Sequence, residues 1–213
     1  MEVLIAAVAP LAMLGTAAMV LAAVAIAVVS ASQGRPRLAA KFGLGAAGLL
    51  GGYLAVLVGV SLASPARTFA PGAEFHFAEF DPHFHVRVLD ARREPGAGGG
   101  TRLILDLAAR SDAARVEQWP SWVRVRLLTE AGGALDPATV DGVAPRIMSE
   151  HPVVFDGAIA PRESMRVQLA FELPSGVTVE ALTIDGDAWP SCWMVGNDIS
   201  WFHKPVRLLL PRG

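Results

Sequence analysis

Two long runs without a charged residue constrain this chain more than any other feature of its sequence. The first run extends from Val3 to Val29 and the second from Phe42 to Ser64. About 20 apolar residues, rising 1.5 Å each, cross the ~30 Å hydrocarbon core of a bilayer. The sequence therefore predicts two transmembrane helices, over about 3–29 and 42–64, within an N-terminal segment 1–67.

The first run does not have the form of a cleaved signal peptide. Such a peptide has a basic start and an apolar stretch of about 7–15 residues. Here the run is longer, and the only charge before it is acidic, on Glu2. We therefore expect a retained helix, and Pro10 is expected to kink it.

The connection between the two runs sets the expected orientation. It carries Arg35, Arg37 and Lys41 and no acid. Because lysine and arginine are concentrated in cytoplasmic loops, this loop is predicted to lie inside. The N-terminus and residues 68–213 are then predicted on the periplasmic side of a bacterial inner membrane.

Small residues form a stripe along the second run. Gly48 and Gly52 are four residues apart, a spacing that allows close approach of helices in lipid. Two interpretations stay open: the two helices pack on each other, or this face docks on other membrane subunits. Neither run has an ionisable residue in its interior, which argues against a proton relay or an axial haem ligand there.

Residues 68–213 have a different character and are predicted to form one β-sandwich domain. Their 19 acids and 14 bases argue against a nucleic-acid surface. Apolar and polar residues alternate in short segments separated by Gly, Pro and Asp turns, as in immunoglobulin-like antiparallel sandwiches. The stretch 136–160 is predicted to be a long loop. About seven strands are expected, at 74–80, 83–89, 102–107, 122–127, 165–173, 177–184 and 206–210.

Histidines near the start of this domain are candidate metal ligands. His83 and His85 would share one face of a strand, and His76 lies close by in sequence. This spacing can bind a copper or zinc ion. A solvated polar strand face is the simpler interpretation and the favoured one. His203 is either a distant third ligand or a cap on the last strand.

Tryptophan is the second unusual feature of the domain. Five are present, and Trp189, Trp193 and Trp201 are close together in sequence. One Trp per sandwich core is usual, and Trp is enriched at interface hot spots and membrane boundaries. We expect a contact surface here rather than core packing.

No catalytic arrangement is evident in the sequence. Ser191 has no base beside it, the Gly98–Gly100 run lacks a Lys and a strand–helix setting, and the single cysteine, Cys192, excludes an internal disulfide. The chain is therefore predicted not to be an enzyme and to need no cofactor.

Two motifs carry a resemblance to known families. Glu163 and Phe171–Pro174 match the "P-G-E … F-E-L-P" signature of telokin-like, immunoglobulin-like bacterial extracellular domains, with Arg162 in place of the usual Gly. The whole layout also resembles uncharacterised two-helix membrane proteins of acidobacterial and gemmatimonad type. Their "G-E-x-x-x-F-C-E-x-D-C-H" segment is similar to Gly72–His83, and their "D-G-D-W … N-S-F-L-H-K" ending is similar to Asp185–Asp187 and Ser200–Lys204.

This resemblance implies a function but also limits it. Glu79, Asp81 and His83 match the family pattern, whereas Ala78 and Pro82 replace its two cysteines, which favours a structural role over metal or redox chemistry. Gemmatimonad photosynthetic reaction centres carry lineage-specific subunits, and the chain resembles a candidate for one. The expected function is a non-catalytic accessory subunit of an electron-transport membrane complex, with other integral membrane subunits and the bilayer as partners. The alternative is a tethered periplasmic copper or zinc module.

Overall fold

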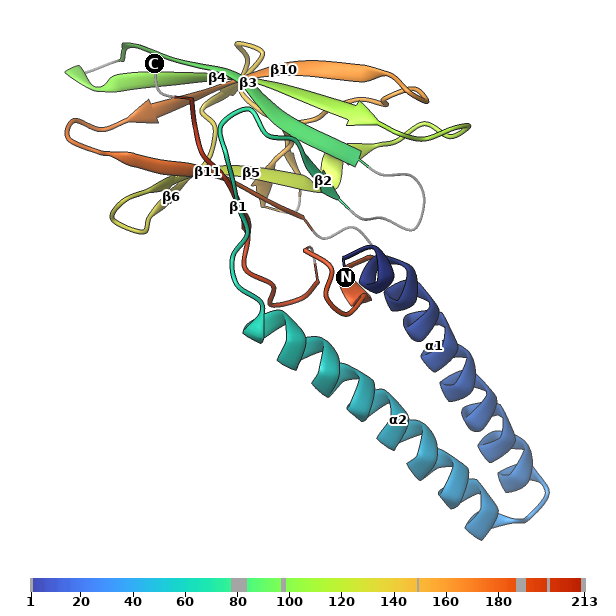
Figure 1. Cartoon of the computed structure of the whole chain (residues 1–213). Coiled ribbons are helices and arrows are strands. Elements are labelled where there is room, and N and C mark those ends of the chain that lie inside the picture. Colours follow the sequence, from blue (N-terminus) through green and yellow to red (C-terminus); the bar gives the residue numbers. More distant parts are fainter. Residues whose placement is uncertain are drawn as a thin grey trace. The chain divides into compact units, whose positions relative to one another are not determined.

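The computed structural model describes residues 2–77, 84–96, 99–148, 150–186, 191–198 and 200–211, with side chains from residue 8 onward. Two helices are followed by a succession of strands (Figure 1). The elements are α1 (Glu2–Ser32), α2 (Pro36–Ala63), β1 (Thr68–Phe69), β2 (Phe75–Phe77), β3 (Phe84–Pro95), β4 (Thr101–Ser111), β5 (Val123–Thr129), β6 (Ala134–Leu135), β7 (Thr139–Val140), β8 (Ile147–Met148), β9 (His151–Pro152), β10 (Ser164–Leu173), β11 (Val179–Gly186) and β12 (Val206–Leu208).

The predicted helical hairpin is present, and both helices are long and apolar enough to cross a membrane. Helix α2 begins six residues earlier than the apolar run, with Pro36 in its first turn. A charged residue limits the stretch that fits the hydrocarbon core of a bilayer, but it does not end a helix. Pro is favoured at the first helical position. Helix α1 continues through Pro10.

A tight turn joins the two helices. Gly34 has a φ of +70°, in the left-handed region that favours glycine. The backbone N–H of Arg35 donates to the carbonyl of Ser30 at 2.9 Å, which closes the end of α1. The predicted nine-residue loop is therefore reduced to three residues.

Most of the β-strands form two five-stranded sheets that pack as a sandwich, and β8 and β9 pair separately as a two-stranded sheet (Figure 1). One sheet has the order β1-β12-β11-β5-β6 and the other β2-β3-β4-β10-β7. Pairing is antiparallel except between β1 and β12, which are parallel. The predicted sandwich class is thus confirmed, with one parallel pair at the edge of a sheet.

Each of the seven predicted strands overlaps a strand of the described residues, although 78–80 of the first and His83 of the second lie outside them. In β10, Val167, Leu169, Phe171 and Leu173 are buried while Glu172 faces out. The additional strands β1, β6 and β7 are two residues long each, which is too short to show a recognisable alternation.

The stretch 136–160 is not simply a loop. It contains β7, β8 and β9, and Val153, Val154 and Phe155 are buried in the core. The ring of Phe155 lies 5.7 Å from that of Phe84, in an edge-on arrangement typical of aromatic pairs. A run of consecutive apolar residues lacks a period of two, so the sequence pattern did not reveal this contribution.

The chain divides into two compact units. The helical unit consists of Met1–Ser64 together with Cys192–His203, and the sandwich unit consists of Pro65–Ser191 together with Lys204–Gly213. The late segment Cys192–His203, which the sequence placed in the sandwich domain, thus belongs with the helices.

Candidate functional site

The segment Cys192–His203, called here the aromatic segment, consists of tight turns that are hydrogen-bonded to one another. Its main chain bonds to itself, since the N–H of Trp201 donates to the carbonyl of Cys192 at 3.2 Å. The Oγ of Ser200 donates to the carbonyl of Met194 at 2.9 Å, and the N–H of His203 donates to the carbonyl of Ser200 at 3.0 Å. Cys192 and Met194 are buried beneath these turns.

A side chain of α2 forms a hydrogen bond to this segment. The hydroxyl of Tyr53 donates a hydrogen bond to the carbonyl of Trp193, with 2.5 Å between the oxygens. Tyr53 is the only tyrosine in the chain. Its position in the middle of an apolar run was the one available sequence signal for this contact, and sequence reasoning missed it.

Aromatic rings form the outer face of the segment. The rings of Trp193 and Trp201 lie 4.2 Å apart between centroids at 49°. Trp201 is 42% exposed and Phe202 is 63% exposed. Phe202 also has a φ of +66°, unusual for a bulky residue, so the tight turn around it sets the direction of its ring.

The other tryptophans do not join this group. Trp122 packs in the sandwich, with its ring 5.0 Å from that of Phe77. Trp119 is 63% exposed on the sandwich unit. Trp189 lies outside the described residues. Of the three tryptophans expected to form a contact surface, the structure describes two, Trp193 and Trp201, and these two lie together.

A groove of about 540 Å³ lies within the helical unit. Its walls are almost entirely apolar, and they come from both helices and from the aromatic segment. They include Ala9 and Ala12 of α1, Gly48, Gly52 and Val56 of α2, and Val195.

The groove bears on how the two glycines are used. A Cβ atom placed on Gly48 or on Gly52 would meet nothing within 4 Å. Neither glycine is therefore in close contact with α1, and both line an open apolar face.

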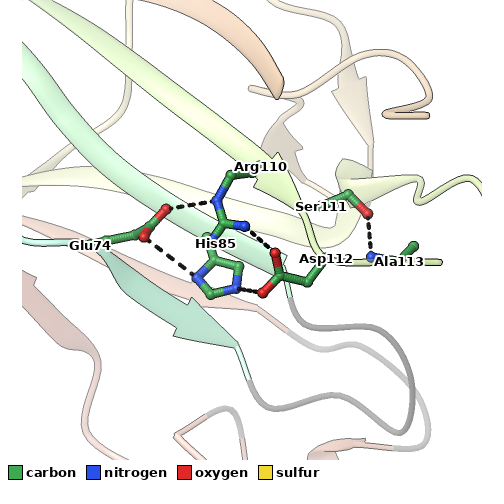
Figure 2. A network of polar contacts seen from close by, with 6 residues as sticks. All are labelled: Glu74, His85, Arg110, Ser111, Asp112 and Ala113. Carbon is green, nitrogen blue, oxygen red and sulfur yellow. Dashed lines mark hydrogen bonds and ion pairs between the residues drawn. The ribbon is translucent and has the colours of Figure 1, made fainter. Parts of the chain in front are cut away.

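A network of charged side chains lies at the edge of the sandwich (Figure 2). His85 on β3 is between two carboxylates, with Nε2 2.7 Å from Oδ2 of Asp112 and Nδ1 3.8 Å from Oε2 of Glu74. Arg110 on β4 donates to Glu74 at 3.3 Å and also to Asp112. The network joins the approach to edge strand β2 with β3 and with the end of β4.

These contacts shift the pKa of two residues of the network, Asp112 and Arg110. Burial alone would raise the pKa of Asp112, but the hydrogen bonds and charges of His85 and Arg110 together lower it. The hydrogen bond and charge of Glu74, with the charge of Asp112, raise the pKa of Arg110. Sequence reasoning missed Arg110 and Asp112, because only the strand register brings them to His85.

The predicted histidine ligands are only partly brought together. His76 on β2 is opposite His85 in the ladder, with ring centroids 5.7 Å apart. His83 lies outside the described residues. His203 belongs to the helical unit, where its Nε2 is 3.9 Å from Oδ1 of Asp198. Among the described residues, no three His, Cys, Asp or Glu side chains gather closely enough to hold a metal ion.

Comparison with known proteins concerns the fold alone. No family model matches the sequence, and no curated protein is significantly similar to it. An uncharacterised β-sandwich protein from Clostridium difficile 630 is 8% identical, with a TM-score of 0.42, over 70% of this chain and 96% of that one. The secreted protein MPT63 from Mycobacterium tuberculosis is 10% identical, with a TM-score of 0.40, over 70% of this chain and 100% of that one.

Proposed function

We propose that this protein is a non-catalytic accessory subunit of a larger membrane complex. In this proposal, α1 and α2 anchor it in a bacterial inner membrane and the sandwich is carried on the periplasmic side. The observation that carries the proposal is the open apolar face at Gly48 and Gly52, which none of the described side chains covers.

The physical argument concerns how helices associate in lipid. Lipid tails are as apolar as leucine, so helices associate through close packing, and small residues permit the closest approach. The groove offers such residues on both sides, with Ala9 and Ala12 facing Gly48 and Gly52 across it. Another integral membrane subunit can therefore seat a helix against α2 more closely than leucine-covered faces allow.

The polar groups of the sandwich support a structural role. His85, Arg110, Glu74 and Asp112 bond to one another and thereby fasten the edge of a sheet. Arg92 of β3 and Gln168 of β10 both donate to the carboxylate of Asp106 on β4, at 3.0 Å and 2.9 Å. These charges are used in holding strands together. The resemblance to gemmatimonad-type membrane proteins extends the proposal to photosynthetic electron-transport complexes.

The test is co-purification from native membranes in a mild detergent. We expect the unmodified chain to migrate with other integral membrane proteins and Gly48→Leu plus Gly52→Leu to migrate alone, because leucine fills the groove. Gly51→Leu is the matched control, since Gly51 also has open space around it but is not part of the groove. If the unmodified chain migrates alone, or if all three proteins keep the same partners, the proposal is wrong.

A further inference from the structure

The aromatic segment contacts α2 at a defined position along the helix. Tyr53 fastens it through the carbonyl of Trp193, and Val195 lines the groove beside Gly52 and Val56. Two independent contacts thus place the segment level with residues in the central part of α2, which ends only at Ala63.

This level can be compared with the thickness of a bilayer. Measured from Lys41, a hydrocarbon core of ~30 Å extends about 20 residues along α2, to Ser61. Tyr53 is about 18 Å from Lys41 at 1.5 Å per residue, so it lies about 12 Å inside the far boundary. Measured from Arg37 instead, Tyr53 still lies about 6 Å inside that boundary.

The segment is built for such a position. Irregular backbone is tolerated at membrane depth only where it is buried in protein or lines a water-filled cavity. Here Cys192, Met194 and Ser200 are buried, and the turns bond them to one another or to their neighbours. The only acid in the segment, Asp198, is close to His203, and both side chains are largely buried, at 14% and 4% exposed. Among the described residues of the segment, Trp201 and Phe202 are the large side chains that face outward.

We propose that the aromatic segment is an interfacial membrane element whose Trp201 and Phe202 side chains insert into the lipid bilayer. This inference rests on the proposed membrane anchor. Tryptophan favours the boundary between headgroups and acyl chains, where its ring is apolar and its N–H remains hydrogen-bonded. The late segment of the chain then returns to the membrane and provides a third point of attachment beside the two helices.

The test is spin-label accessibility in the full-length chain, reconstituted in vesicles of phosphatidylcholine and phosphatidylglycerol. Cys192→Ser removes the native thiol, and single cysteines replace Phe202, Leu14 of α1 or Val143 of the sandwich. Leu14 and Val143 are matched controls, because their side chains are 52% and 65% exposed in the chain itself. Collision of each label with apolar oxygen and with a water-soluble nickel chelate reports lipid or water around it.

We expect the label at residue 202 to resemble the label at residue 14, with a several-fold preference for oxygen over the chelate. If it resembles the label at residue 143, the inference is wrong while the anchor stands. If the label at residue 14 is also in water, the anchor itself fails. Protection of residue 202 from both reagents would mean a protein contact and would also overturn the lipid assignment.

A second measurement avoids altering Phe202. Tryptophan fluorescence of the otherwise unmodified chain is recorded in vesicles that contain lipids brominated near the headgroup end of their chains. We expect strong quenching that Trp201→Phe reduces and Trp119→Phe does not. Equal quenching in the two variants would contradict insertion of Trp201.

Discussion

The hydroxyl of Tyr53 donates a hydrogen bond to the carbonyl of Trp193, which lies 140 residues later in the chain. This bond joins a long apolar helix to a segment that follows the last long strand of the sandwich. It explains why Cys192–His203 belongs to the helical unit rather than to the sandwich.

Loss of this bond is expected to release the aromatic segment. Tyr53→Phe keeps the ring but removes the donor, so the free energy of unfolding should fall by about 0.5–1.5 kcal/mol. Cys192 is buried within the segment, and its thiol should therefore react faster with a thiol reagent in the variant. Unchanged reactivity of Cys192 in detergent-solubilised Tyr53→Phe would show that other contacts hold the segment.

Close packing against Trp122 should make Gly186 irreplaceable. A Cβ atom at Gly186 would lie 2.5 Å from Cε3 of the Trp122 ring, which is rigid and packed against Phe77. Gly186→Ala should destabilise the protein by about 1–3 kcal/mol in denaturant unfolding followed by Trp fluorescence.

Gly157→Ala is the control for this prediction. Its Cβ would lie 3.2 Å from the end of the flexible Met165 side chain, which is able to move aside. The prediction is contradicted if the two variants unfold at the same denaturant concentration.

The charged network predicts a dependence of stability on acid. The folded pKa of Asp112 lies below its usual value of 3.8, so Asp112 stabilises the protein above that pH. This stabilisation is lost as the pH falls through the lower, folded pKa. Asp112 is largely exposed, so the screened contribution is about 0.2–1 kcal/mol.

The measurement is unfolding by denaturant between pH 6 and the acid limit, for the parent and Asp112→Asn. The two proteins should differ at pH 6, and the difference should shrink as the pH falls below about 3.8 and vanish below the lower, folded pKa. Asp156→Asn breaks a single exposed pair with Arg146 and serves as the control. A constant difference between parent and Asp112→Asn at every pH would exclude the ionised carboxylate as the cause.

The turn between the helices provides a test of orientation. Gln33 is exposed beside Arg35, in the turn expected to face the cytoplasm. Gln33→Cys in a Cys192→Ser background should resist a membrane-impermeant thiol reagent in intact cells and react after the membrane is opened. Val143→Cys in the sandwich should react in cells whose outer membrane alone is permeable. The reverse pattern would invert the topology.

The local pattern of the sequence was enough to predict the two helices and the long strands. A charge-free run of sufficient length and an alternation with a period of two are properties of neighbouring residues, so α1, α2 and strands such as β10 were predictable. The same reasoning placed the start of α2 too late, because the charged residues before the apolar run are also helical. It also misjudged the stretch 136–160, where the elements are short or fully apolar.

Relationships between distant residues were decided only by the tertiary structure. Strand register places His76 opposite His85 and brings Arg110 and Asp112 to the same cluster. Trp193 meets Tyr53 although the two residues are far apart in the chain. The packing of the elements also leaves open space beside Gly48. Such contacts depend on how whole elements pack, because residues far apart in the chain have no local pattern that specifies their meeting.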